Sequence, residues 1–418
     1  MKTIFKTEEA PAGRIPITKP VFDEEEEAAV VHVLRSGWLV QGPRVAEFEE
    51  LFRTWIGVRH AVATSSCTTA LHLALLAAGV GPGDGVLLPS FTFIATANAV
   101  EYTGATPLFI DIDPATYTID PVRIEECLSK KSGSLRPRAI IPVSLFGLCA
   151  DMEAIRDIAD RYDLCIIEDA ACGFGAKRNG RFAGTEALAG CFSFHPRKSI
   201  TTGEGGMVVT DNDAIADRVR TLRDHGASKT DLARHLAQGG SLLPEFAMLG
   251  YNYRMTDLQG ALGVTQMKKA EAILEARRRA ARRYNELLVS SEFITPPFVP
   301  VNCTHAYQSY VCLYQGQDLT SKDGRTLNWP SIARWNSARN RLMAYLEGEG
   351  IAVRQGTHAV HTLDYYKKKY GLADYDYPFS YIADRLSITL PLYCGMEATV
   401  QERVVTLLNG AGSQRGAL

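Results

Sequence analysis

Between residues 60 and 210, short apolar segments alternate with longer segments of helical periodicity, which limits the folds open to this chain. The expected strands are HAVATS, GVLLPS, ATPLFIDID, RAIIPVSLFG, LCIIEDA and GCFSF. The segments between them, among them TTALHLALLAAG and MEAIRDIADRY, have the apolar spacing of helices. Such alternation is typical of a mainly parallel sheet that helices cover on both faces. We therefore predict an α/β fold.

The chain has 418 residues, which is more than one ordinary compact core accommodates. We expect a large domain over residues 1–270 and a smaller C-terminal α/β domain over residues 271–418. A long polar-faced helix that begins after residue 255 would connect them. Within this helix, the run EARRRAARR is more typical of a solvated face than of a binding patch.

The net charge and the cysteine content argue against several classes of partner and site. Forty-five basic and 47 acidic residues give a formal net charge of −2, which disfavours a nucleic-acid partner. The nine cysteines are scattered and never spaced as CxxC, so neither a disulfide framework nor a structural zinc site is expected. The N-terminus lacks an apolar signal region and the chain lacks a long apolar run, so we expect a cytoplasmic protein without a membrane segment.

Hydroxyl side chains gather at the start of an expected helix in TSSCTTALHLALLAAG, residues 64–79. Ser66, Thr68 and Thr69 would lie around its N-terminus, where free backbone N–H groups and the helix dipole favour an anion. Serine and threonine are also common simple N-caps. Taken alone, the segment favours capping and leaves an anion site open.

Two reactive side chains follow two of the expected strands. Asp169 stands at the end of LCIIEDA, at the edge where open α/β sheets bind ligands, although an aspartate there can also cap a helix. Lys198 follows CFSF and precedes the glycine-rich TTGEGG. A lysine in such a turn can form a Schiff base with a carbonyl compound, whereas most single lysines are simply exposed. Neither residue decides the chemistry alone.

In chain order, these features match the requirements of pyridoxal 5′-phosphate (PLP). A helix N-terminus receives the phosphate, an aromatic side chain stacks on the ring, a carboxylate keeps the ring nitrogen protonated, and a lysine binds the aldehyde. The aromatic side chain would come from SFTFIATAN, which follows an expected strand. The sequence therefore predicts a PLP-dependent enzyme.

The sequence also resembles the DegT–StrS family of fold-type I PLP-dependent nucleotide-sugar aminotransferases over most of its length. The motifs that carry this resemblance are SGWLVQGPRVAEFEELF, TSSCTTALHLAL, GPGDGVLLPSFTFIATANAV, GATPLFIDIDPATYTID, IIEDAACGFGA, FSFHPRKSITTGEGGMVVTD and LGYNYRMTDLQGALGVTQ. The resemblance implies a large domain with a mainly parallel seven-stranded sheet between helices, and a smaller C-terminal domain.

The resemblance also implies a role for each matching residue. Lys198 is the Schiff-base lysine, Asp169 is the partner of the ring nitrogen, and Phe93 is the aromatic that stacks on the ring. The phosphate-binding positions are Thr68, Thr69 and Ser193, and Cys67 is a further cofactor-binding position. Asn252, in GYNYR, matches an asparagine that reaches the phosphate from the neighbouring subunit, which implies a homodimer with shared active sites.

This chain departs from the family pattern at two cysteines. Cys67 replaces a glycine that many relatives have in SGTAAL, and the backbone donors there should be retained. Cys172 stands where the family usually has glutamine or histidine, close to the cofactor, so cofactor electronics or substrate selection can differ here.

The resemblance implies transfer of an amino group from an amino acid, expected to be L-glutamate, to a keto-sugar linked to a nucleotide diphosphate. Lys198 would also carry the proton between the substrate and the cofactor. Candidate substrate residues are His225, Arg254 and His358. Two alternatives within the family are an aminotransferase of a cyclitol or another ketone, and a pyridoxamine-dependent sugar dehydratase. Dehydratases of the family have histidine at the lysine position, so Lys198 argues against the second.

Two short motifs suggest other function classes. The DID of Asp111–Asp113 resembles the metal-binding motif of glycosyltransferases, but it is short and common. His358 and His361 in HAVH have no nearby acidic third ligand, so a structural or substrate-facing pair is expected rather than a metal site. A non-catalytic regulator with the same fold is disfavoured by the intact set of Lys198, Asp169 and Ser193.

Overall fold

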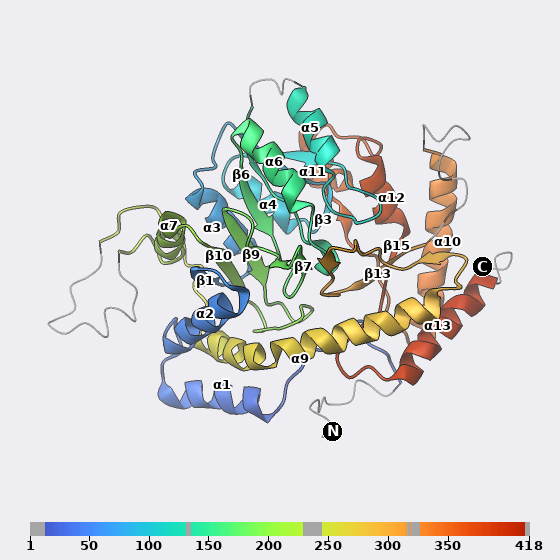
Figure 1. Cartoon of the computed structure of the whole chain (residues 1–418), viewed down its shortest axis with the longest axis horizontal. Helices are drawn as coiled ribbons and strands as arrows, with labels where there is room; N and C mark the ends of the chain where they lie inside the picture. The colour runs from blue at the N-terminus through green and yellow to red at the C-terminus, as the bar shows by residue number, and fades with distance from the viewer. Residues whose placement is uncertain are drawn as a thin grey trace.

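A computed structural model describes residues 13–130, 135–228, 245–314, 316, 319 and 327–413 of the chain. Within these residues, a seven-stranded sheet forms the centre of the larger part of the structure (Figure 1). In spatial order its strands are β1 (His60–Thr64), β10 (Gly206–Thr210), β9 (Ala189–Ser193), β6 (Cys165–Asp169), β5 (Arg136–Ile140), β2 (Asp84–Pro89) and β4 (Thr106–Ile110). The strands from β9 to β4 run parallel, whereas β10 is antiparallel to β9 and β1. The predicted mainly parallel α/β sheet is confirmed.

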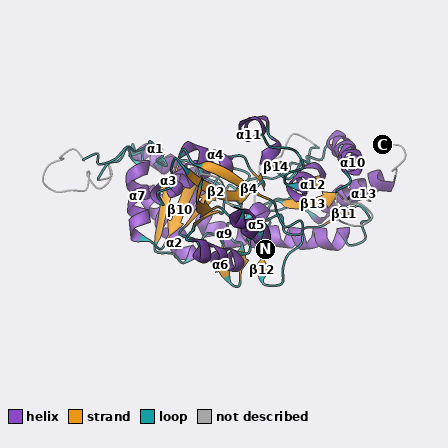
Figure 2. Cartoon of the chain, turned by 90° about the horizontal axis from the view of Figure 1, so that it is seen from above, coloured by secondary structure: helices purple, strands orange, loops and turns teal. Residues whose placement is uncertain are grey.

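Helices cover both faces of this sheet, as Figure 2 shows. One face packs against α3 (Cys67–Ala77), α4 (Ala95–Tyr102) and α7 (Asp213–Arg223). The other packs against α2 (Pro43–Ile56), α5 (Pro121–Ser129), α6 (Met152–Tyr162) and α9 (Asp257–Leu288). Because both faces are covered, most strand residues are buried. This burial explains why the amino-acid sequences of the strands are nearly continuous apolar runs.

The long helix α9 connects the seven-stranded sheet to a second, smaller sheet (Figure 1). The strands of this antiparallel sheet are β11 (Ile294–Thr295), β13 (Tyr310–Tyr314) and β15 (Ser387–Leu390). Its core also includes residues of α10 (Trp329–Gly348) and α13 (Ala398–Ser413). Residue 270, the predicted end of the large domain, lies inside α9, so the domain boundary stays a prediction.

Arg277 corrects one expectation about α9. The run EARRRAARR was expected to lie on a solvated face, and Arg282 is indeed 57% exposed. Arg277, however, is fully buried and donates hydrogen bonds to the carbonyls of Tyr307 and Gln308 at 2.9 and 2.6 Å. The interpretation is therefore wrong for Arg277, because this guanidinium anchors the loop before β13.

Helix α1 (Glu24–Ser36) and several short elements complete the described part of the chain. Helix α1 lies along α9, and its first turn is closed by a capping box between Asp23 and Glu26. The other short elements are β3 (Phe91–Thr92), β7 (Lys177–Arg178), β8 (Arg181–Phe182), β12 (Cys303–Thr304), β14 (His358–Ala359), α11 (Asp364–Tyr370) and α12 (Pro378–Leu386). Strand β14 pairs with β3 and so brings the C-terminal part of the chain against the carboxyl edge of the large sheet. No helix among the described residues is long and apolar enough to cross a membrane.

Candidate active site

Asp169 ends strand β6 at the carboxyl edge of the sheet and is buried. Its Oδ2 accepts a hydrogen bond from the Thr96 hydroxyl at 2.8 Å, and its Oδ1 accepts one from the Ala171 backbone N–H at 3.1 Å. Burial raises the pKa of Asp169, while these two bonds and the nearby charge of Lys198 oppose that rise. The carboxylate is thus held in one orientation and favours a cationic partner. The sequence reasoning did not identify Thr96, which lies in the first turn of α4, three residues after Phe93.

Lys198 lies in the turn between β9 and β10, where it is partly buried. Its backbone N–H donates to the His195 carbonyl at 2.8 Å, and its Nζ lies 3.2 Å from the Cys172 Sγ. Cys172 follows β6 by three residues, so the structure brings the predicted lysine to the same sheet edge as Asp169.

Gly206, the last glycine of the segment TTGEGG after Lys198, lies very close to the start of α3. A Cβ at this position would lie 2.4 Å from the Ser66 carbonyl and 2.7 Å from the Cys67 nitrogen. Only glycine allows β10 to pass so close to the start of α3. Ser193, the last residue of β9, pairs with Gly206 and therefore lies beside the same helix start.

The hydroxyl-rich start of α3 confirms the capping interpretation. Ser66 is the N-cap, and its Oγ accepts from the Thr69 N–H at 3.2 Å while the Thr69 hydroxyl accepts from the Ser66 N–H at 3.1 Å. The Cys67 thiol is buried against the Cys191 carbonyl, so only its backbone can serve a ligand. The N–H groups of Cys67 and Thr68 have no partner within the helix, which leaves two donors for an anion.

Phe93 lies between β3 and α4, and 58% of its surface is exposed. Its carbonyl accepts a hydrogen bond from the backbone N–H of Thr96 at 3.1 Å, and the Thr96 hydroxyl donates to Asp169. An aromatic ring that is exposed in this way is available to stack on a planar ligand.

Asn252, His225 and Arg254 lie together beside this edge. Asn252 is exposed and forms a backbone bridge with Asp224, and the His225 N–H donates to the Tyr251 carbonyl. The Arg254 guanidinium pairs with Asp224. The segment adjoins the start of α3, because the Ser65 N–H donates to the Tyr253 carbonyl at 2.8 Å.

The two histidines of HAVH have different environments. The His358 side chain is 51% exposed and lies 4.0 Å from the Asp384 carboxylate. In the pairing of β14 with β3, His358 lies opposite Thr92. His361 is buried, with one ring nitrogen 2.6 Å from the Ser90 hydroxyl and the other 3.1 Å from the Asp374 carbonyl. His361 is thus held inside the fold, whereas the His358 ring is exposed to solvent.

Asp111 of the DID motif has a structural role. Its carboxylate accepts from the backbone N–H groups of Phe379 and Ser380 and from the Ser380 hydroxyl, at 2.7–2.9 Å. These contacts hold the first turn of α12 and explain the motif without a metal-dependent glycosyl transfer.

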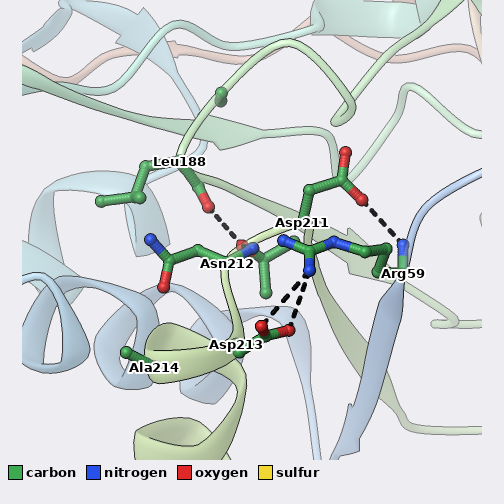
Figure 3. A pocket seen from close by; sticks show the side chains of 8 residues that line it. Arg59, Leu188, Asp211, Asn212, Asp213 and Ala214 are labelled. Carbon is green, nitrogen blue, oxygen red and sulfur yellow. Dashed lines mark hydrogen bonds and ion pairs between the residues drawn. The ribbon is translucent and has the colours of Figure 1, made fainter.

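Figure 3 shows a surface hollow that lies elsewhere, around Thr210 and the start of α7. Arg59 pairs with Asp213 there, and its backbone N–H donates to Asp211. Because Ser193 and Gly206 lie at the opposite end of the β9–β10 pair from Thr210, this hollow is separate from the predicted site.

The residues at the carboxyl edge fit PLP. A lysine amine, an oriented buried carboxylate, an exposed aromatic ring and free N–H groups at a helix start supply the contacts that this cofactor requires.

Comparison with known proteins agrees with this geometry. Residues 20–409 match the sequence pattern of the DegT/DnrJ/EryC1/StrS aminotransferase family. The GDP-perosamine synthase of Caulobacter vibrioides is 34% identical over 95% of this chain and 98% of its own length. A DegT DnrJ EryC1 StrS aminotransferase from Brucella abortus has a TM-score of 0.78 at 32% identity, covering 92% of this chain and 95% of that one.

The Spr1654 structure from Streptococcus pneumoniae, described in a PLP form, has a TM-score of 0.83 at 25% identity, over 96% of this chain and 99% of that one. The cofactor of the family is therefore the one that the edge residues fit. The chain belongs to the DegT/DnrJ/EryC1/StrS family of sugar aminotransferases and is a PLP-dependent aminotransferase.

Proposed function

We propose that the enzyme transfers the amino group of L-glutamate to a keto-sugar linked to a nucleotide diphosphate. The observation that carries this proposal is the meeting of Lys198 and Asp169 at one sheet edge, in a chain whose relative is a GDP-perosamine synthase. The name of that relative supports a nucleotide-linked sugar as the acceptor. When bound, PLP stores the amino group between the two half-reactions and stabilises negative charge on the reacting carbon.

Different residues of this chain would contact the phosphate, the ring and the ring nitrogen of PLP. The backbone N–H groups of Cys67 and Thr68 and the hydroxyl of Ser193 would bind the phosphate, because they gather at the start of α3. Phe93 would stack on the ring. Asp169, oriented by Thr96, would stay ionised beside the ring nitrogen.

Lys198 would hold the cofactor covalently between turnovers. Once released, its Nζ would take a proton from the substrate carbon of the donor and deliver a proton to the carbon of the acceptor. A lysine at this position also argues against the dehydratase alternative, which needs a side chain that cannot bind the aldehyde.

A homodimer with shared active sites would complete the phosphate site through Asn252 of the partner subunit. The exposed position of Asn252 supports this proposal, as do the neighbouring apolar residues Phe246 and Leu249, which are 62% and 85% exposed. Burial of these side chains against a second copy would remove an apolar surface from water.

His358 is the substrate candidate with the strongest structural support, because β14 places it across from Thr92, next to Phe93. Its exposed ring could donate a hydrogen bond to a sugar hydroxyl. His225 and Arg254 stay predictions, and the pairing of Arg254 with Asp224 leaves its guanidinium less available.

The test is to incubate the holoenzyme with L-glutamate and a panel of nucleotide-linked keto-sugars, and to measure 2-oxoglutarate and the amino sugar by mass spectrometry. We expect equal amounts of both products with at least one acceptor, and none with Lys198→Arg. Turnover of a free keto-cyclitol but of none of the nucleotide-linked sugars would instead establish the cyclitol alternative.

A further inference from the structure

Cys172 and Lys198 form a contact between a thiol and an amine at the carboxyl edge of the large sheet. The Lys198 Nζ lies 3.2 Å from the Cys172 Sγ, and among the described residues it is the one hydrogen-bond partner of this thiol. Both residues are only partly buried, so the contact remains open to small molecules. If the sulfur becomes electrophilic, the group that it meets is therefore an amine and not a second thiol.

The backbone fixes both residues independently of their side-chain contact. Directly after Cys172, the Gly173 N–H donates to the Ala170 carbonyl at 2.8 Å. In the other segment, the Lys198 N–H donates to the His195 carbonyl at 2.8 Å. The fold thus holds the thiol and the amine together, and the flexible lysine side chain needs only a small movement to reach the sulfur.

Positive charge gathers around the thiol. Besides Lys198, the Arg354 guanidinium lies near it. Burial lowers the pKa of Arg354 and the charge of Arg197 lowers it further, whereas Cys172 acts in the opposite direction. Cysteines that peroxides oxidise selectively are partly exposed and lie beside cations, and Cys172 has both properties.

The other cysteines of the chain are less suited to oxidation. The buried ones are Cys67, Cys149, Cys191, Cys312 and Cys394. Burial also raises the pKa of the thiols of Cys127, Cys165 and Cys303, which are partly buried. A raised pKa leaves less thiolate, and the thiolate is the form that reacts with a peroxide. Cys172 is therefore the favoured site of oxidation.

We propose that hydroperoxides oxidise Cys172 and that the oxidised sulfur then forms a reversible covalent bond with the Nζ of Lys198. In the first step, hydrogen peroxide transfers one oxygen to the thiol, which gives a sulfenic acid and one water. In the second step, the amine attacks the sulfur, so that an S–N bond forms and the S–O bond breaks. The leaving hydroxyl group takes a proton from the amine and departs as a second water. The cysteine sulfur is oxidised by two electrons, and the peroxide is reduced to water.

This bond removes the amine to which PLP is attached. The modified enzyme could hold the cofactor only through its noncovalent contacts and would be inactive. Thiol reductants reverse the modification. One thiol attacks the sulfur, which returns the amine of Lys198 and leaves a mixed disulfide on Cys172, and a second thiol releases the cysteine. The bond also protects Cys172 from irreversible oxidation to a sulfinic acid.

The test uses enzyme loaded with pyridoxamine 5′-phosphate, which leaves the amine of Lys198 free. This enzyme is treated with hydrogen peroxide, digested with trypsin and analysed by mass spectrometry. We expect residues 162–177 and 198–218 in one cross-linked peptide, about 2 Da lighter than the sum of the two peptides. Enzyme loaded with PLP, in which the amine is occupied, should give about tenfold less of it. Dithiothreitol should separate the two peptides again.

Three variants assign the bond to its two residues. Cys165 lies in the same tryptic peptide but at the other end of β6, so Cys165→Ser is the matched control and should keep the cross-link. Cys172→Ser should lose it. Lys198→Arg keeps the thiol without the amine, so Cys172 should instead gain about 32 Da, the mass of the two oxygens of a sulfinic acid. Circular dichroism checks that each variant is folded.

The modification goes beyond the proposed function, and one further sample keeps the two apart. PLP-loaded enzyme is treated with peroxide in the presence of L-glutamate. If L-glutamate is the donor, it frees Lys198 and should raise the yield of cross-linked peptide to about that of the pyridoxamine-loaded enzyme. No rise in this sample, with the cross-link present in the pyridoxamine-loaded enzyme, would contradict the donor and support the modification.

Three results would overturn the proposed bond. The first is a wild-type digest in which Cys172 carries a sulfinic acid and the two peptides stay separate. The second is a disulfide between Cys172 and Cys67 in place of the bond to Lys198. The third is a cross-link that persists in Cys172→Ser or is lost in Cys165→Ser.

Discussion

The Lys198 Nζ lies 3.2 Å from the Sγ of Cys172, and this thiol is the one side-chain hydrogen-bond partner of the amine among the described residues. The contact joins the segment after β6 to the turn after β9, which are the two segments that carry Asp169 and Lys198. Cys172 can therefore position the amine of Lys198.

Replacing Cys172 tests this positioning role. Cys172→Ser keeps a polar neighbour for Lys198, and we expect the rate of the L-glutamate half-reaction to stay within about threefold of wild type. Cys172→Ala removes that neighbour, and we expect the rate of the L-glutamate half-reaction to fall about tenfold with PLP still bound. The reason is that a less restrained amine spends less time in the position from which it can take the substrate proton. Stopped-flow absorbance measures both rates. Equal rates in Cys172→Ala and wild type would remove Cys172 from the mechanism.

Gly206→Ala should disrupt the contact between β10 and the start of α3. The added Cβ would lie 2.4 Å from the Ser66 carbonyl, so backbone must move, and we expect a loss of stability of about 1–3 kcal/mol together with weaker PLP binding. Gly348 in α10 has open space around its Cα, so Gly348→Ala is the matched control and should stabilise the protein by about 0.5–1 kcal/mol. Thermal unfolding and cofactor titration compare the two variants. A Gly206→Ala protein as stable as wild type would contradict the close approach.

Glu168 predicts a specific dependence of stability on pH. Burial raises the pKa of Glu168 to about 7, and the bonds from the Ser144 hydroxyl and the Gly184 N–H only partly oppose this. The folded protein therefore binds this proton more tightly than the unfolded chain. The contribution of protonated Glu168 to the free energy of unfolding is complete below about pH 4.5 and is lost as the pH rises through about 7.

Glu168→Gln removes this titration while its amide oxygen can still accept from Gly184. The free energy of unfolding of wild type, relative to Glu168→Gln, should fall by about 3 kcal/mol between pH 4.5 and pH 8. Chemical denaturation across this pH range measures the difference. A constant difference between the two proteins would show that Glu168 does not titrate in this window.

The proposed homodimer predicts complementation between two defective chains. Lys198→Ala cannot bind the aldehyde, and Asn252→Ala would bind the phosphate weakly. If each site combines Lys198 of one subunit with Asn252 of the partner subunit, a mixed dimer contains one intact site. Co-expression with two different affinity tags, followed by purification on both, should recover part of the wild-type activity. An inactive mixed dimer, or a fully active Asn252→Ala enzyme, would contradict the shared site.

Local pattern was enough to predict the sheet and the residues at its edge. The strand that ends at Asp169 is buried on both faces, so its apolar run and its terminal carboxylate are both visible in the sequence. Lys198 and the hydroxyl cluster at the start of α3 could be found for the same reason, since each lies within five residues of the end of a strand with a clear pattern.

Contacts between distant segments could not be predicted in this way. Arg277 has the sequence environment of an exposed helix residue, and only its bonds to Tyr307 and Gln308 show that it is buried. Thr96 orients Asp169 across 73 positions of sequence, and His358 and His361 differ because one faces outward and the other contacts Ser90. Such roles depend on which elements the fold places side by side.

The most direct test of the central claim is the visible absorption spectrum of the purified holoenzyme before and after addition of L-glutamate. The account predicts a yellow band in wild type that fades with L-glutamate as 2-oxoglutarate forms, and no such lysine-dependent band in Lys198→Ala. The same band in Lys198→Ala, or fading of the cofactor band with L-glutamate at the wild-type rate in that variant, would contradict the assignment of Lys198.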